Sequence, residues 1–180
     1  MSKIGKKNII IPKDSSIKIE GANLTITGPK GSKILTINDK IFSSKLNENE
    51  FQILPLNKKV DKKTSIMWGT YRSLINNAIR GVSVGHEKIL ELNGVGFRAS
   101  IKGENLNLQI GFSHDVNFKI PKDIKITVEK QTLIKISGVD KDLVSKTSAD
   151  IKGLKPVEPY KAKGITEKGQ FILRKEGKKK

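Results

Sequence analysis

Two glycine spacings in the sequence are those of nucleotide-binding motifs, but neither has the other residues that such a motif requires. Residues 94–99 read Gly-Val-Gly-Phe-Arg-Ala, a form of the dinucleotide fingerprint, which needs a helix directly after it to hold a phosphate. Residues 100–110 instead have the pattern of a β-hairpin. Residues 164–169 have the glycine spacing of a P-loop, yet Gln170 and Phe171 replace the Lys and Ser/Thr that contact phosphate and magnesium. We therefore expect no cofactor.

The residues that usually perform catalysis or bind metals are few and scattered. The chain has no Cys, and its only two His, His86 and His114, are 28 positions apart, which argues against a metal centre. Ser113, His114 and Asp115 are adjacent in sequence, so they cannot face one another as a catalytic triad does. We expect a surface turn there and a protein that is not an enzyme. The alternative is an RNA-acting enzyme or maturation factor with an unrecognised site.

The charge of the chain points to a polyanionic partner. Its 35 Lys and Arg against 18 Asp and Glu give a net charge of +17, and its pI is about 10.0. An AT-rich genome would explain Lys in place of Arg, but not the excess of bases over acids. Nucleic acid is the first candidate and an anionic membrane the second. A membrane-binding helix needs a Lys-rich polar face, whereas the first predicted helix has only Arg72 and Arg80 in its body; we expect no membrane partner.

The basic residues concentrate near the C-terminus. Residues 161–180 hold eight bases against two acids. Two prolines precede Tyr160 and restrict the backbone, so Lys161 and Lys163 are expected on a semi-rigid loop. Tyr160 offers a stacking surface, and Gly164 would permit close backbone approach. The alternative interpretation is a solvated C-terminal tail.

Alternating apolar and polar residues predict β-strands along most of the chain, each with one buried and one exposed face. This alternation covers residues 24–27, 106–110, 124–129 and 134–136. Helical spacing predicts helices within residues 67–82 and 143–154. Asp61 or Thr64 is the expected N-cap of the first helix, and Asp140 that of the second.

These elements occur twice. Residues 23–27 match residues 105–109, and residues 51–54 match residues 133–136, in both cases 82 positions apart. Each half of the chain then continues from strands to one helix. The order of the elements therefore indicates an internal duplication.

The duplication predicts an α+β fold of two tandem similar domains. Each domain is expected to be a small antiparallel sheet packed against one helix. The predicted boundaries are residues 1–82 for the N-terminal domain and 83–180 for the C-terminal domain, which carries the basic loop and tail.

Residues 155–165, Lys-Pro-Val-Glu-Pro-Tyr-Lys-Ala-Lys-Gly-Ile, resemble the signature of the bacterial-type large ribosomal subunit protein six family. The resemblance extends over the whole chain in the expected order. It is carried further by residues 2–7, 9–12, 28–31, 69–74, 92–99, 111–114 and 174–178.

The resemblance implies a structural, non-catalytic protein of the large ribosomal subunit. Such a protein would bind large-subunit rRNA near the sarcin–ricin loop and the stalk base, beside other ribosomal proteins. It would work in a bacterial or organellar ribosome, with no small-molecule substrate. The RNA-facing residues that the resemblance implies are Pro159, Tyr160, Lys161, Lys163, Gly164, Arg174, Lys175 and Lys178, with Arg98 and His114 on hairpin turns.

Several residues depart from the pattern of the family. Ala162 stands where Gly is usual, Val157 where Pro is usual, and Asp115 where Pro follows the His. Thr166 and Glu167 replace an Arg and a Tyr, so a bidentate phosphate partner and a stacking surface are absent and a repelling carboxylate is added. We expect local differences in RNA binding at these positions.

Overall fold

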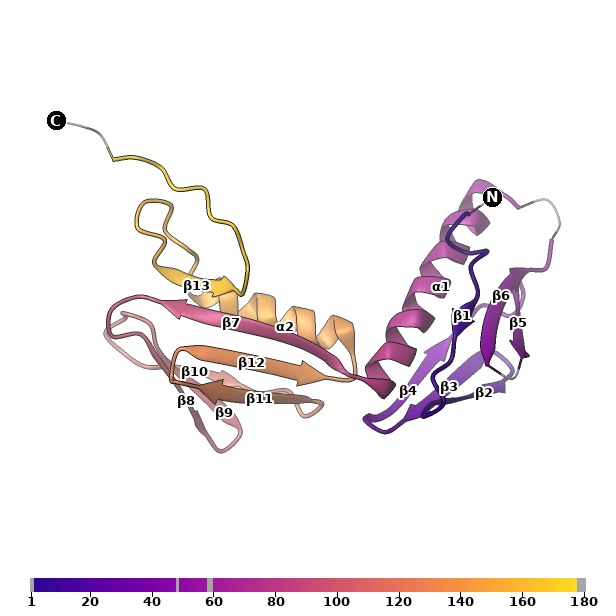
Figure 1. Ribbon diagram of the computed structural model, residues 1–180, viewed down its shortest axis with the longest axis horizontal. Helices are drawn as coiled ribbons and strands as arrows, with labels where there is room; N and C mark the ends of the chain where they lie inside the picture. The colour runs from indigo at the N-terminus through magenta and orange to yellow at the C-terminus, as the bar shows by residue number, and fades with distance from the viewer. Residues whose placement is uncertain (1, 48, 58–59, 178–180) are drawn as a thin grey trace. The chain divides into compact units, whose positions relative to one another are not determined.

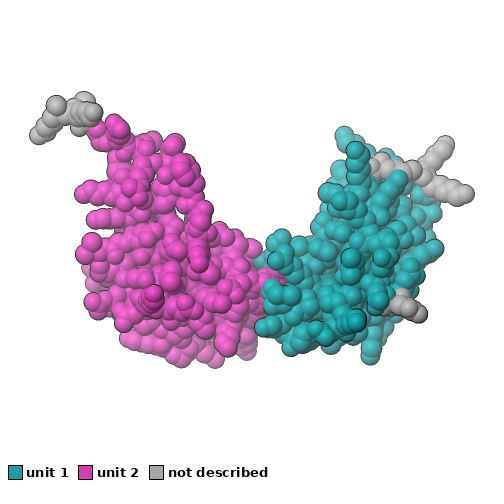
Figure 2. All heavy atoms as spheres, in the orientation of Figure 1, with its two compact units in different colours: residues 1–85, 139–141 teal, residues 86–138, 142–180 magenta. Residues whose placement is uncertain are grey.

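The chain forms two compact units (Figure 2). The structure is a computed structural model that describes residues 2–47, 49–57 and 60–177. Unit 1 consists of residues 1–85 with residues 139–141, and unit 2 of residues 86–138 with residues 142–180. Both units combine small antiparallel sheets with one helix, so the predicted α+β class and tandem similarity are confirmed.

Unit 1 contains two antiparallel sheets rather than the single sheet that was predicted (Figure 1). In one sheet the middle strand β3 (Asn23–Gly28) lies between β2 (Ser16–Glu20) and β4 (Gly31–Thr36). In the other, β6 (Glu50–Pro55) lies between β1 (Ile9–Ile10) and β5 (Phe42–Asn47). Alternation within one strand says which face is buried, but not which strands share a sheet.

Helix α1 (Lys62–Ser83) packs against strands of both sheets. The Asp61 side chain accepts a hydrogen bond from the backbone N–H of Lys62, so the N-cap is the first of the two predicted residues. Trp68 is buried, and its indole N–H donates to the carbonyl of Ile53 on β6 at 2.8 Å. At the other end of the helix, the carbonyl of Val82 accepts from the backbone N–H of Lys30 in the β3–β4 turn.

Unit 2 repeats this arrangement. Strand β9 (Asn105–Gln109) lies between β8 (Arg98–Lys102) and β10 (Val116–Lys119). The second sheet has the order β11 (Ile124–Glu129), β12 (Leu133–Gly138), β7 (His86–Asn93) and β13 (Gly164–Glu167). Helix α2 (Lys141–Leu154) buries Val144 and Ile151 within the same core as Leu90 and Ile134.

The segments that match in the sequence occupy matching places in the two units. Residues 23–27 and 105–109 lie in the middle strands β3 and β9 of their sheets. Residues 51–54 and 133–136 lie in β6 and β12, and the order β1-β6-β5 corresponds to β7-β12-β11. Strand β13 extends this second arrangement by one strand, on the outer edge of β7.

Candidate nucleic-acid interface

The segment between α2 and β13, residues 155–163, forms a closed loop that we call the basic loop (Figure 1). The backbone N–H of Glu158 donates to the carbonyl of Lys163 at 2.8 Å, and that of Ala162 donates to the carbonyl of Glu158 at 3.0 Å. At its base, the N–H of Ile165 donates to the carbonyl of Lys155 at 3.0 Å. These bonds hold Tyr160 and Lys161, both exposed, at the end of the loop.

Strand β13 fixes the basic loop to the sheet of unit 2. It pairs antiparallel with β7, with Gly164 opposite Asn93 and Glu167 opposite Leu90. Ile165 between them is fully buried in the core. The basic loop is therefore joined directly to an edge strand, β13, which the buried side chain of Ile165 anchors in the core.

Thr166 and Glu167, which depart from the family pattern, have partners within the chain. Thr166 is buried, and its hydroxyl accepts from the Asn93 side-chain amide at 2.9 Å. The Glu167 carboxylate lies 2.6 Å from the Lys88 ammonium, so its negative charge is already paired with a cation. A partly exposed pair of this kind contributes little to stability, but it reduces the repulsion that Glu167 would exert on a phosphate.

Two residues at the end of the basic loop have positive φ angles. Gly164 has φ +140°, and a Cβ on it would lie 2.8 Å from both the Pro156 carbonyl oxygen and the Val157 Cα. The close approach that the sequence suggested for RNA at Gly164 is thus made by the chain's own backbone. Ala162 has φ +56° and is buried, a conformation in which glycine meets no steric cost, which accounts for the Gly usual at this position.

The C-terminal segment of residues 170–177, which we call the tail, is attached to the basic loop. The backbone N–H of Lys175 donates to the carbonyl of Pro159 at 2.9 Å. This bond brings Arg174 and Lys175, both exposed, to the loop that carries Lys161. The basic loop enters β13 at one end and the tail leaves it at the other, and both then lie on the same side of the strand (Figure 1). Lys178, also a predicted contact residue, lies outside the described residues.

The two remaining predicted residues, Arg98 and His114, lie on the sheet of β8, β9 and β10. Arg98 is the first residue of β8 and faces Gln109 across the ladder, so its predicted place on a hairpin turn is wrong. His114 is exposed in the turn between β9 and β10, as predicted. Its ring lies nearly parallel to that of Phe112, at an interplanar angle of 17°. The Lys155 ammonium lies 4.4 Å from the centre of the Phe112 ring and connects this turn to the basic loop.

The basic loop and the tail bring several cations together. We call them the basic surface, and they are Lys155, Lys161, Lys163, Arg174 and Lys175. The ion pairs Lys33–Asp140, Lys88–Glu167 and Lys135–Glu87, seen among the described residues, do not involve the basic surface. Sequence reasoning did not select Phe112 or Lys155, although Phe112 lies in the same motif as His114. Lys155 opens the motif of residues 155–165, so both residues lay next to predicted contact residues in the sequence.

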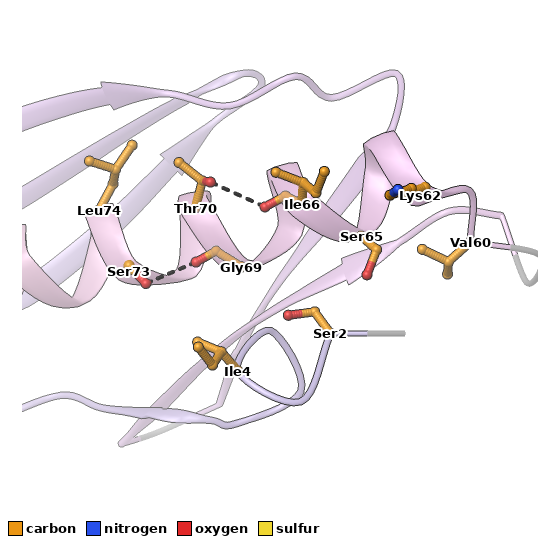
Figure 3. A pocket seen from close by; sticks show the side chains of 10 residues that line it. All are labelled: Ser2, Ile4, Val60, Lys62, Ser65, Ile66, Gly69, Thr70, Ser73 and Leu74. Carbon is orange, nitrogen blue, oxygen red and sulfur yellow. Dashed lines mark hydrogen bonds between the residues drawn. The ribbon is translucent and has the colours of Figure 1, made fainter.

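A groove of about 870 Å³ lies in unit 1 between α1 and the N-terminal residues Ser2 and Ile4, away from the basic loop in sequence (Figure 3). Metal sites and membrane spans find no support in the described part of the chain. Its His, Asp and Glu residues form no group of three that could hold a metal ion. Of the helices in residues 2–47, 49–57 and 60–177, none is long and apolar enough to cross a membrane.

The duplicated α+β fold and the unpaired basic surface together define a basic two-domain protein suited to a polyanionic partner. Comparison with known proteins gives the family. The model of the family described as Ribosomal protein L6 matches residues 11–85 and 93–168, so the chain belongs to the ribosomal protein L6 family. The resemblance noted in the sequence is thereby confirmed.

Relatives of this chain carry the name Large ribosomal subunit protein uL6. One from Staphylococcus carnosus is 46% identical over 179 residues, which cover 99% of this chain and 98% of the relative. Another from Beijerinckia indica subsp. indica is 44% identical over 180 residues, covering 100% of both chains. A third, from Phenylobacterium zucineum, is also 44% identical over 180 residues and the full length of both.

Proposed function

We propose that the protein is a structural, non-catalytic component of the large ribosomal subunit that binds large-subunit rRNA through its basic surface. Its family and the names of its full-length relatives support the subunit. The observation that carries the RNA-binding site is the hydrogen bond from the Lys175 N–H to the Pro159 carbonyl. That bond joins two separate basic segments into one surface.

Phosphate contacts dominate this binding. Lys and Arg neutralise the RNA backbone, and such contacts set position rather than read sequence. The closed basic loop lowers the entropy that is lost on binding, because its backbone is already hydrogen-bonded before RNA arrives. Tyr160, which is 53% exposed beside Lys161, adds a surface on which a base or sugar stacks.

The finer location of the site follows from the family resemblance. We place the basic surface against rRNA near the sarcin–ricin loop and the base of the stalk, with other large-subunit proteins as neighbours. The ribosome is that of a bacterium or of an organelle that encodes its own ribosomal proteins. Chemical footprinting of large subunits with and without the protein tests this location: protection confined to rRNA elsewhere would contradict it.

The salt dependence of RNA binding tests the mechanism. If the protein neutralises about 6–8 phosphates, the slope of log K against log salt is about −5 to −7. The variant Lys161→Ala/Lys163→Ala removes two cations and should reduce the size of the slope by about 2. The matched control is Lys122→Ala/Lys125→Ala, which removes the same charge near β11, at the opposite edge of the sheet from β13. Equal losses from both variants would mean diffuse attraction without a site.

Sedimentation of a lysate on a sucrose gradient tests the assignment to the ribosome. The protein should appear in mature large subunits in a one-to-one ratio and persist through a moderate-salt wash. If it met only precursor particles, a maturation factor would be the better interpretation.

A further inference from the structure

A groove of about 590 Å³ lies beside the basic surface, and two members of that surface, Lys155 and Lys163, are part of its lining. One wall is formed by Phe97, Gly111 and Phe112, from the turns that precede β8 and follow β9. The other wall comes from the end of α2 and from the basic loop, including Lys155 and Lys163. Its volume falls within the range of about 300–1,000 Å³ that is typical of small-molecule sites.

The aromatic wall is held in place by glycines. A Cβ on Gly94 would lie 2.8 Å from the Phe97 ring, and a Cβ on Gly111 would lie 3.2 Å from it. Gly111 also has φ +76°, which turns the chain directly before Phe112. Phe97 thus fits closely between two glycines, and the groove is formed before any ligand enters it.

Phe112 presents an aromatic surface at the edge of this groove. It is 47% exposed, although burial of a phenylalanine ring would be favourable. The exposed His114 ring is stacked nearly parallel to it, with 6.3 Å between the ring centres. The Lys155 ammonium lies 4.4 Å from the Phe112 ring centre and places a positive charge at the same spot.

A flat aromatic surface beside two cations matches the chemistry of a nucleotide. A nucleobase stacks on aromatic rings, and its phosphate pairs with Lys. An apolar peptide would leave Lys155 and Lys163 without counter-charges. Glu158, the acidic side chain on the lining, offers an acceptor to the N–H groups of a base edge.

We propose that one unpaired nucleobase of the bound RNA stacks on the face of Phe112 that the Lys155 ammonium covers in the free protein, and that this ammonium shifts to the phosphate of that nucleotide, beside Lys163. The proposal rests on the RNA-binding function proposed above and adds to it a preference for RNA with an unstacked base. Bases within a continuous duplex are unavailable to such a site. The basic surface alone would not distinguish the two kinds of RNA, because both carry the same phosphates.

The test compares two short RNA hairpins that differ by a single bulged adenosine. Base–aromatic stacking makes a preference of about 5- to 100-fold for the bulged hairpin the expected result. Phe112→Leu should abolish this preference and leave the affinity for the fully paired hairpin and its salt slope unchanged. The matched control is Phe171→Leu, the same change at an aromatic residue that is 86% exposed in the tail and absent from the groove lining; it should keep the preference.

A second variant reports the contact directly and does not depend on the stability of Phe112→Leu. Phe112→Trp keeps an aromatic surface, so it should retain the preference, and its added fluorescence should be quenched by the bulged hairpin only. Equal binding of the two hairpins by the natural protein would overturn the stacking site and leave the proposed function standing. Failure to bind either hairpin, with binding to intact large-subunit rRNA also absent, would instead overturn the proposed function.

Discussion

Replacing Gly164 by alanine adds one methyl group at the point where the basic loop joins the sheet. Gly164 has φ +140°, and its missing Cβ points at the backbone of residues 155–157. The added carbon would lie 2.8 Å from the Pro156 oxygen, well inside ordinary contact distance. We expect one of two responses: the basic loop moves away from β13, or β13 separates from β7.

The expected cost has two parts. An alanine forced into this sparsely populated region costs about 1–3 kcal/mol, and the displacement of tightly packed backbone adds about 1–3 kcal/mol. We therefore expect the free energy of unfolding to fall by about 3 kcal/mol, because small shifts of the chain relieve part of both costs. For a unit of this size, each kcal/mol lowers the Tm by about 4–8 °C.

Two other glycines separate the contributions. Gly169 has φ +82° and no atom within 4 Å of its Cβ position, so Gly169→Ala tests the backbone conformation without the collision; about 1–2 kcal/mol is expected. Gly153 lies in α2 with open space around it, and Gly153→Ala should stabilise by about 0.5–1 kcal/mol.

Circular dichroism and amide hydrogen exchange measure these changes. In Gly164→Ala, the amides of Glu158 and Ile165, whose hydrogen bonds close the loop, should exchange about 100-fold faster, which corresponds to about 3 kcal/mol. The affinity for rRNA should fall as well. If Gly164→Ala were no more destabilising than Gly169→Ala, the collision with residues 155–157 would not exist in solution and the reasoning would be refuted.

Two further changes test hydrogen bonds described above. Lys175→Pro removes both the charge and the N–H that donates to the Pro159 carbonyl, whereas Lys175→Ala removes only the charge. The affinity for rRNA should be about tenfold lower in the proline variant than in the alanine variant, because the tail is then released from the basic loop. Equal affinities of the two variants would show that the bond is unimportant for binding. Trp68→Phe removes a buried hydrogen bond to the Ile53 carbonyl and leaves that acceptor unpaired. Chemical denaturation should therefore show that the free energy of unfolding of unit 1 falls by about 2–3 kcal/mol. A fall of less than about 0.5 kcal/mol would argue against the bond.

The sequence patterns predicted those parts of the fold that depend on neighbouring residues. The alternation in residues 24–27 and 106–110 identified the strands β3 and β9 and their buried apolar residues. The predicted exposed face of β9 is wrong at Asn107, which is buried as well. The spacing of apolar residues identified α1, but not the burial of Trp68, because its place depends on Gly5, whose Cβ would lie 2.5 Å from the Trp68 ring. The pairing of strands into two sheets per unit could not be predicted either, because it depends on contacts between residues far apart in the sequence.

The sequence predicted several residues of the candidate site, but not the contacts that bring them together. Lys161 and Lys163 stood out through charge and through the family resemblance. Strand β13 was missed because four residues are too few for a clear alternation, and its partner β7 is far away in the sequence. The hydrogen bond between Lys175 and Pro159 carries no local signal at all, since any residue except proline has the required N–H.

The pairing of β13 with β7 also sets an order of events during synthesis of the chain. Strand β7 ends at Asn93, whereas the partner of its outer edge begins only at Gly164. A nascent chain that has already made α1, β12 and α2 therefore has an open β-edge, which invites pairing with other chains. The arrival of the last residues closes that edge and positions the basic loop in the same step. A chain released early would thus lack the positioned basic loop and keep an edge prone to aggregation.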